Sequence, residues 1–335
     1  MARPRVSVLL PVFDAASTLA TTLRSIQRHS ETSWECIIVD DGSTDASSDI
    51  ARMISGADRR FRVVHAERRG LVSALNIGIS QCRGRYIARM DADDLMHRAR
   101  LERQANALDA SPGLAGLGCQ VRIFPRAALG SGMRAYERWI NGVDSEVRLL
   151  DEVLVECPIA HPTLMIRREV LHSLAYRDCG WPEDYDLVLR ALRGGHRLGV
   201  VAERLLSWRN LPTRLSQNSD TYTVERFVDC KAAHIAETLL RDDDTYALWG
   251  YGATGRALQR ALRAHGKRPA VIVELHPGRI GNQIAGAPVV HPDQWLASRA
   301  HRLVVSVAGE TARSQIREVL GRAELRERLD FVCAA

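Results

Sequence analysis

Lysine is nearly absent from this 335-residue sequence, which contains only Lys231 and Lys267. The other 44 of its 46 basic residues are arginines, and with 40 acidic residues the formal net charge is +6. Residues 1–220 hold 30 basic and 27 acidic side chains, and residues 221–335 hold 16 and 13, so the positive charge is evenly spread. A nucleic-acid surface concentrates its basic residues in a stripe or a tail. We therefore predict that nucleic acid is not a partner.

Cysteine pairs with the spacing of a metal site are also missing. The seven cysteines are odd in number and widely spaced, and no Cys-x-x-Cys occurs. This pattern argues against a disulfide framework or a zinc site and for a reducing compartment. No apolar run reaches the ~18–20 residues that cross a bilayer. We expect a cytoplasmic protein without a transmembrane segment; peripheral association with the inner face of the membrane stays open, and composition indicates no oligomeric state.

Strand-type and helix-type segments alternate from the start of the chain. Short apolar runs predict strands, and apolar residues at helical spacing predict helices. The predicted strands are residues 6–12, 34–39, 61–65 and 85–90, with helices at 17–29, 45–55 and 71–82 between them. This alternation indicates an α/β fold with a mostly parallel sheet and right-handed crossovers. Ligands of such sheets bind beyond the carboxyl ends of the strands.

The later sequence predicts a second domain. The pattern loosens after residue 124, two further strands are predicted at 198–201 and 205–208, and a new α/β alternation begins at Tyr246. We therefore expect a first domain over residues 1–220, a linking helix over 221–242 and a small α/β domain over 243–335.

Two acidic clusters follow predicted strands. In an extended segment Asp91 and Asp93 point the same way, so their carboxylates converge, and Mn²⁺ or Mg²⁺ would keep the two charges together. Asp40 and Asp41 follow the second strand, where a carboxylate can accept hydrogen bonds from a ribose or a base. Each cluster also has a simpler explanation, because acidic loops and turns that cap helices are common.

Several ordered segments resemble glycosyltransferase family 2, the inverting enzymes with the GT-A fold. They are VSVLLPVF (6–13), IIVDDGSTD (37–45), RRGLVSALNIGI (68–79), GRYIARMDADD (84–94), RLERQ (100–104), CPIAHPTLMIRREVL (157–171) and PEDYDLVLRALRGGHRLGVVAERLLSWR (182–209). The match covers roughly residues 5–215. The resemblance implies a nucleoside-diphosphate sugar donor, a divalent metal and a saccharide, lipid-linked or other hydroxyl acceptor. It also implies a place in the synthesis of bacterial cell-surface polysaccharide or glycoconjugate.

The resemblance also implies roles for individual residues. Those assigned to the donor nucleotide are Pro11, Val12, Phe13, Asp40, Asp41, Asp91 and either Arg68 or Arg69. Asp93 would be the main metal ligand, with Asp91 beside it, and Asp184 would be the catalytic base. Arg68, Arg69 and Arg209 are candidate anion contacts, where a planar guanidinium suits phosphate.

The acceptor region is assigned to Glu183, His161 and Trp139. Each has an alternative: Glu183 and Asp184 also suit a helix N-terminus, and His161 and Trp139 also suit core packing. The family often has Tyr-Arg-x-His after its last strand, whereas this chain has Trp208-Arg209-Asn210-Leu211. The missing histidine puts in doubt a third metal ligand or a loop closure at this point.

The second domain carries a glycine pattern, Gly250-x-Gly252-x-x-Gly255, between a predicted strand and helix. Glu274 ends the next strand, and together these residues match the dinucleotide-binding fingerprint of a Rossmann-like domain. NAD or another nucleotide is therefore one expectation, and a structural or assembly role is the other. Three alternatives stay open for the whole chain: a nucleotidyltransferase, a catalytically silent nucleotide-sugar-binding scaffold, and an NAD-dependent oxidoreductase.

Overall fold

The computed structural model describes residues 3–211, 214 and 218–335, and its chain divides into two compact units. The first unit comprises Met1–Leu150, Pro158–Cys179 and Asp186–Arg214, and the second comprises Asp151–Cys157, Gly180–Tyr185 and Leu215–Ala335. The second unit thus includes two short segments that lie before residue 220 in the sequence.

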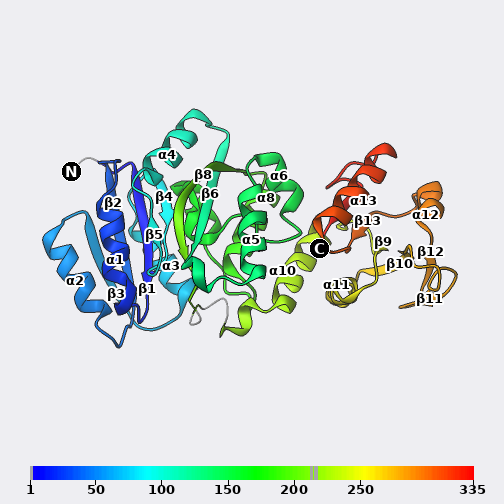
Figure 1. Ribbon diagram of the computed structural model, residues 1–335, viewed down its shortest axis with the longest axis horizontal. Helices are drawn as coiled ribbons and strands as arrows, with labels where there is room; N and C mark the ends of the chain where they lie inside the picture. The colour runs from blue at the N-terminus through cyan, green and yellow to red at the C-terminus, as the bar shows by residue number, and fades with distance from the viewer. Residues whose placement is uncertain (1–2, 212–213, 215–217) are drawn as a thin grey trace. The chain divides into compact units, whose positions relative to one another are not determined.

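The first unit is built on an eight-stranded sheet with the order β3-β2-β1-β4-β7-β6-β8-β5 (Figure 1). Its strands are β1 (Val6–Val12), β2 (Trp34–Asp41), β3 (Phe61–Ala66), β4 (Tyr86–Arg89), β5 (Leu95–Met96), β6 (Leu114–Phe124), β7 (Met165–Arg167) and β8 (Arg197–Arg209). The first four strands are parallel neighbours, as predicted. β7 is antiparallel to β4 and to β6, whereas β6 and β8 are parallel.

Helices connect these strands. They are α1 (Ala16–Gln27), α2 (Ser47–Ala57), α3 (Leu71–Gln81), α4 (Arg100–Ala110), α5 (Ser131–Gly142), α6 (Glu146–Glu152), α7 (Arg168–Leu174) and α8 (Glu183–Arg193), with short 3-10 turns η1 (Arg126–Ala128) and η2 (His161–Thr163). The predicted pair of strands at 198–201 and 205–208 is wrong, because β8 is one strand. Its register against β6 shifts after Val201, and this irregularity explains the polar interruption in the sequence.

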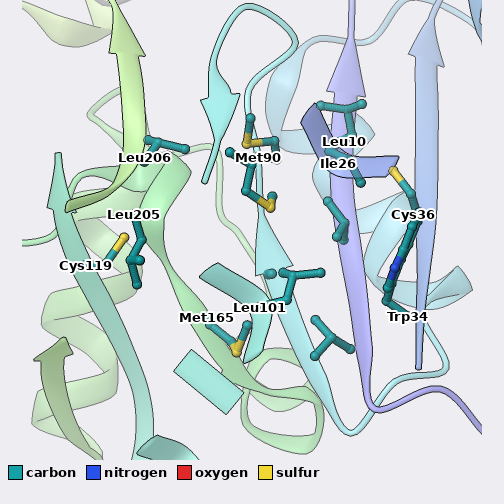
Figure 2. Packing of buried hydrophobic residues seen from close by; sticks show 14 of the residues in the cluster. Leu10, Ile26, Trp34, Cys36, Met90, Leu101, Cys119, Met165, Leu205 and Leu206 are labelled. Atoms are coloured by element: carbon teal, nitrogen blue, oxygen red, sulfur yellow. The ribbon is translucent and has the colours of Figure 1, made fainter. Parts of the chain in front are cut away.

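Alternate residues of β1 face opposite sides of the sheet. Val8 and Leu10 belong to a buried cluster that includes Leu23 and Ile26 of α1 and continues through the residues labelled in Figure 2. Leu9 faces the other side, where α3 approaches closely: a Cβ at Gly78 would lie 2.1 Å from Leu9 Cδ1. Both faces of β1 are therefore covered, as its continuous apolar run predicts.

The second unit contains a six-stranded sheet with the order β11-β12-β10-β9-β13-β14. Its elements are η3 (Asp220–Tyr222), α10 (Val224–Glu237), β9 (Thr245–Trp249), α11 (Ala253–Ala264), β10 (Arg268–Val273), β11 (Gln283–Ile284), β12 (Ala287–Val290), α12 (Pro292–Ser298), β13 (Leu303–Val305), α13 (Glu310–Arg322) and β14 (Phe331–Cys333). All strand pairs except β11 with β12 are parallel. With β9 counted first, the parallel strands follow the order 3-2-1-4-5 of a doubly wound sheet. Within the described residues, no helix is both long and apolar enough to cross a membrane.

Candidate active site

The carboxyl ends of β1, β2 and β4 lie next to one another. β1 pairs in parallel with both other strands, and Val12 is the register partner of Asp40. Pro11 and Val12 end β1 and are buried, and Phe13 follows with 38% of its surface exposed. The structure therefore brings the residues predicted for the donor nucleotide to one edge of the sheet.

Asp41 is buried and holds the loop before α3. Its two carboxylate oxygens accept the backbone N–H groups of Arg69 and Gly70, each over 2.9 Å. Gly42 makes the close approach of the two loops feasible: its φ is +72°, and a Cβ there would lie 3.0 Å from the Arg68 nitrogen. Asp41 thus orients the backbone that carries both candidate arginines.

Arg68 and Arg69 have different side-chain environments. The Arg68 guanidinium lies over the Phe13 ring, 3.2 Å from its centroid. The Arg69 guanidinium pairs with Glu67 over 3.2 Å, and both of these side chains are largely exposed. Only Arg68 therefore joins a residue of the predicted nucleotide pocket through its side chain.

Asp40 is also buried, with its oxygens already engaged. Oδ1 accepts the Ser43 N–H over 3.1 Å, and Oδ2 lies 3.3 Å from His65 Nδ1. Burial alone would raise the pKa of Asp40, but hydrogen bonds from Ser43, Ser48 and His65 lower it below its usual range. Asp40 is therefore a charged group that orders the turn after β2.

Three carboxylates converge after β4. One oxygen from each of Asp91, Asp93 and Asp94 can be chosen so that all three lie within 4.8 Å of one another. Arg89 at the end of β4 pairs with Asp91. Asp94 Oδ1 accepts the Arg209 N–H over 2.7 Å, and Arg209 Nε donates to the Asp93 carbonyl over 2.6 Å. β8 therefore fixes the acidic segment through Arg209.

The three carboxylates are electrostatically unlike. Burial and the charge of Asp91 raise the pKa of Asp93 to about 6. Burial, Asp91 and Asp93 raise the pKa of Asp94 well above its usual range. Burial acts in the same direction on Asp91, but Arg89 and other nearby positive charges outweigh it and lower its pKa.

This donor set fits a hard divalent cation. Asp91 and Asp93 are partly exposed and offer carboxylate oxygens, which suit Mg²⁺ or Mn²⁺. Burial and the charge of Asp91, which raise the pKa of Asp93, make a second negative charge unfavourable there without a counter-ion. The residues present therefore fit the predicted metal.

The predicted acceptor residues of the first unit are held by packing contacts. His161 begins η2, is buried, and its Nε2 lies 2.8 Å from Tyr176 Oη. Trp139 packs on the hydrophobic core, with its ring 5.7 Å from that of Tyr136. Tyr136 in turn lies 6.0 Å from Trp208. The core-packing alternative thus describes the observed position of Trp139.

Glu183 and Asp184 belong to the second unit and begin α8. Glu183 is 3% exposed and accepts a hydrogen bond from Tyr222 Oη over 2.5 Å. Asp184 is half-buried, and its Oδ1 accepts the Tyr185 N–H over 2.8 Å. Of the two carboxylates, Asp184 is the more accessible to another molecule.

The glycine pattern of the second unit has local structural causes. Gly250 has φ +93°, and a Cβ at Gly255 would lie 2.3 Å from the Gly250 oxygen. Glu274 Oε1 accepts the Tyr251 N–H over 2.8 Å and pairs with Arg279 over 2.9 Å. The acid expected to hold a ribose is thus bound to the glycine loop itself. A nucleotide at this loop stays a prediction.

Sequence reasoning missed several contacts of this region. Asp94 adjoins the predicted pair, so its place in the carboxylate cluster had a signal in the sequence. Arg89 precedes Asp91 by two residues, which places both on one side of an extended segment. The bonds from Arg209 to the acidic segment and from Tyr222 to Glu183 had no such signal, because they join residues 115 and 39 positions apart.

The sequence profile of "Glycosyl transferase family 2" matches residues 7–174, about half of the chain. The chain belongs to glycosyltransferase family 2. This glycosyltransferase is 29% identical over 238 residues to the putative glycosyltransferase EpsE of Bacillus subtilis, an alignment that covers 67% of this chain and 80% of the relative. It is 27% identical over 217 residues to the putative teichuronic acid biosynthesis glycosyltransferase TuaG of the same organism, covering 64% and 83%.

Solved structures show the fold of this family 2 glycosyltransferase. It matches S. aureus TarS 1–349, solved in complex with UDP-GlcNAc, with a TM-score of 0.54 and 16% identity over 78% of this chain and 72% of that one. It matches the mannosyltransferase PcManGT from Pyrobaculum calidifontis, solved with GDP-Man and Mn²⁺, with a TM-score of 0.54 and 18% identity over 97% and 82% of the two chains. The predicted GT-A fold is thereby confirmed.

Proposed function

We propose that this glycosyltransferase moves a sugar from a nucleoside-diphosphate sugar to a hydroxyl acceptor, with inversion at the anomeric carbon and in dependence on a divalent metal. The observation that carries the proposal is the group of converging carboxylates at the carboxyl end of β4. The nucleotide-sugar and Mn²⁺ complexes of the two structural neighbours support it. The synthesis of a cell-surface polymer is supported by the name of the TuaG relative.

The donor nucleotide is assigned to the edge formed by β1, β2 and the loop before α3. Phe13 and Arg68 form a stacked pair there, and a guanidinium is suited to a phosphate oxygen. Asp41 orients the loop through its backbone N–H groups, so its contribution to donor binding includes positioning Arg68. Asp40 plays a similar part for the turn after β2.

Asp91 and Asp93 are assigned to the metal, which would stabilise the negative charge that develops on the diphosphate leaving group. Arg89 holds the Asp91 carboxylate, and Arg209 holds the backbone of Asp93. The two ligands are therefore fixed from both ends of their segment before a cation binds, and such preorganisation favours binding.

Asp184 is assigned the role of general base. It takes the proton of the acceptor hydroxyl as the acceptor oxygen attacks the anomeric carbon. The bond from that carbon to the diphosphate breaks, and the diphosphate leaves with the electron pair. A single displacement from the opposite face inverts the configuration, as it does in inverting glycosidases. His161 and Glu183 are kept as residues that shape the acceptor region.

A panel of nucleotide sugars tests the proposal. The melting temperature of the full chain is measured with UDP, GDP, dTDP and CDP sugars, each with Mn²⁺ and with EDTA. One base should raise the melting temperature in Mn²⁺ and not in EDTA, because a ligand that binds the native state stabilises it. The Asp93→Ala variant should lose this rise. A metal-independent rise, or an equal rise in Asp93→Ala, would remove the metal from the proposal.

A further inference from the structure

The short segment Asp151–Cys157 is held by side chains near the end of the chain. Glu152 has 1% exposure and forms ion pairs with Arg313 over 3.2 Å and with Arg317 over 2.9 Å. Arg317 also pairs with Glu327 over 2.9 Å, and its Nη2 donates to the Asp151 carbonyl over 2.5 Å. Both arginines belong to α13, so this helix is bound to a segment more than 150 residues earlier.

Further contacts attach the same segment to the second unit. Lys231 of α10, one of the two lysines of the chain, is buried, and its Nζ donates to the Val155 carbonyl over 2.9 Å and to the Ala334 carbonyl over 3.0 Å. The Val155 side chain packs against the hydrophobic cluster that includes Trp249 and Leu320. The segment is therefore part of the packing of the C-terminal sheet and its helices.

The first turn of α8 rests on this anchored segment. Tyr185 is fully buried, and its Oη donates to the Val153 carbonyl over 2.7 Å. Its ring lies 5.8 Å from that of Phe227 in α10. The neighbouring Glu183 accepts its hydrogen bond from Tyr222 in η3. Both residues that flank Asp184 in the chain are thus fixed by the second unit.

We propose that the second unit positions the catalytic base: its elements η3 and α10 and the segment Asp151–Cys157 hold Asp184 through Glu183 and Tyr185. The inference rests on the proposed function, in which Asp184 takes the acceptor proton. Tyr222, Glu152 and Arg317 are then positioning residues, which act on Asp184 through its neighbours in the chain. A base must keep its geometry closely, since a shift of about 1 Å can cost roughly a hundredfold in rate.

If these contacts only stabilise the fold, their variants should lose stability and activity together. A positioning role predicts a loss of activity that is larger than the loss of stability explains. Removing one partner of the buried Glu152 pairs leaves an uncompensated charge, so such variants lose stability whether or not the segment serves catalysis. Tyr222 is only half-buried, and Tyr222→Phe removes one hydroxyl from beside Glu183. Its cost in stability should be smaller than that of a Glu152 variant, because Tyr222 is neutral and half-buried, so the change leaves no unpaired ion of opposite charge.

The experiment measures sugar transfer by the full chain with Mn²⁺ and saturating acceptor. Tyr222→Phe should lower kcat roughly tenfold or more, with the donor KM and the donor-induced rise in melting temperature unchanged and the chain still folded at the assay temperature. In a Glu183→Gln background, Tyr222→Phe should add little further loss, because Tyr222 acts through Glu183. A fall in melting temperature that matches the loss of activity would instead show a structural role.

Two controls separate this inference from the proposed function. Arg322→Ala removes an exposed pair with Glu318 on α13 and should leave kcat at the parent value. Asp184→Ala should abolish transfer. If the parent transfers sugar and Asp184→Ala does not, while Tyr222→Phe keeps the parent kcat, the positioning role is overturned and the proposed function stands. If Asp184→Ala transfers at the parent rate, the assignment of the base fails, and the positioning role fails with it.

Discussion

The backbone N–H of Arg209 donates to Asp94 Oδ1 over 2.7 Å and so joins β8 to the acidic segment that follows β4. This bond gives Asp94 a different part from its two neighbours. Asp94 is fully buried and its pKa lies well above the usual range, whereas Asp91 and Asp93 are partly exposed. Asp94 is therefore hydrogen-bonded at one end of the loop, and we propose that Asp91 and Asp93 hold the cation.

Substitutions at Asp94 and Asp93 should distinguish the hydrogen-bonding role of Asp94 from the proposed metal-binding role of Asp93. Asp94→Asn keeps an oxygen that can accept the Arg209 N–H, so Mn²⁺ binding and the melting temperature should stay near the parent values. Asp93→Asn removes a proposed ligand and should weaken Mn²⁺ binding at least tenfold, an effect in the range known for altered metal sites. Calorimetric titration with Mn²⁺ measures both. Equal losses in the two variants would make Asp94 a metal ligand.

The affinity for Mn²⁺ should depend on pH through Asp93. Its pKa is raised to about 6, so the carboxyl group is increasingly protonated as the pH falls below that value. The metal needs the carboxylate, and the apparent affinity should therefore fall roughly tenfold per pH unit below about 6 and change little above it. Calorimetric titrations with Mn²⁺ at pH values on both sides of 6 measure the direction of the change in affinity and the pH at which it begins. An affinity that is flat across these pH values would contradict the proposed ligand.

The two neighbouring arginines should differ in donor binding. Arg68 stacks on Phe13, whereas the Arg69 side chain pairs with the exposed Glu67. Arg68→Ala should raise the donor KM about tenfold, which corresponds to about 1.4 kcal/mol. Arg69→Ala is the matched control and should change it little, because its backbone N–H still binds Asp41. The reverse order of effects would assign the phosphate contact to Arg69.

Alanine substitutions at Gly255 and Gly252 should change the stability of the second unit by different amounts, because the two sites differ in free space. Gly255→Ala places a Cβ 2.3 Å from the Gly250 oxygen, a backbone atom that cannot move aside easily. Its free energy of unfolding should fall by about 1–3 kcal/mol. A Cβ at Gly252 would have no described atom within 4 Å, and the φ of this residue is negative, so Gly252→Ala should be close to neutral. Denaturant unfolding of both variants makes the comparison, and equal stabilities would contradict the packing explanation.

The local sequence pattern predicted the edge of the sheet at which the acidic residues of the first unit lie. The apolar runs ending at Val12 and Val39 and the alternation with helices were sufficient for this, because parallel neighbours bring their carboxyl ends together. Contacts between distant segments could not be predicted in the same way. The Arg209 bond to Asp94 depends on the pairing of β5 with β8, which no local pattern encodes.

In the second unit, too, local elements were predicted from the sequence and contacts between distant residues were not. The strand, glycine loop and helix at residues 245–264 were predicted from sequence. The engagement of Glu274 by the Tyr251 N–H was not, since the same acid at the end of a strand also fits a ribose. The attachment of Glu152 to α13 was equally hidden, because an acidic residue at the end of a short helix is expected to be solvent-exposed.

Transfer of sugar by the parent chain and by Asp184→Ala tests the central claim most directly. Both proteins are given the donor selected by the nucleotide-sugar panel, Mn²⁺ and a hydroxyl acceptor, and the glycosylated product and its anomeric configuration are determined. We expect a metal-dependent product of inverted configuration from the parent and none from Asp184→Ala, with donor binding intact in both. A product of retained configuration, or equal transfer by the two proteins, would contradict this claim.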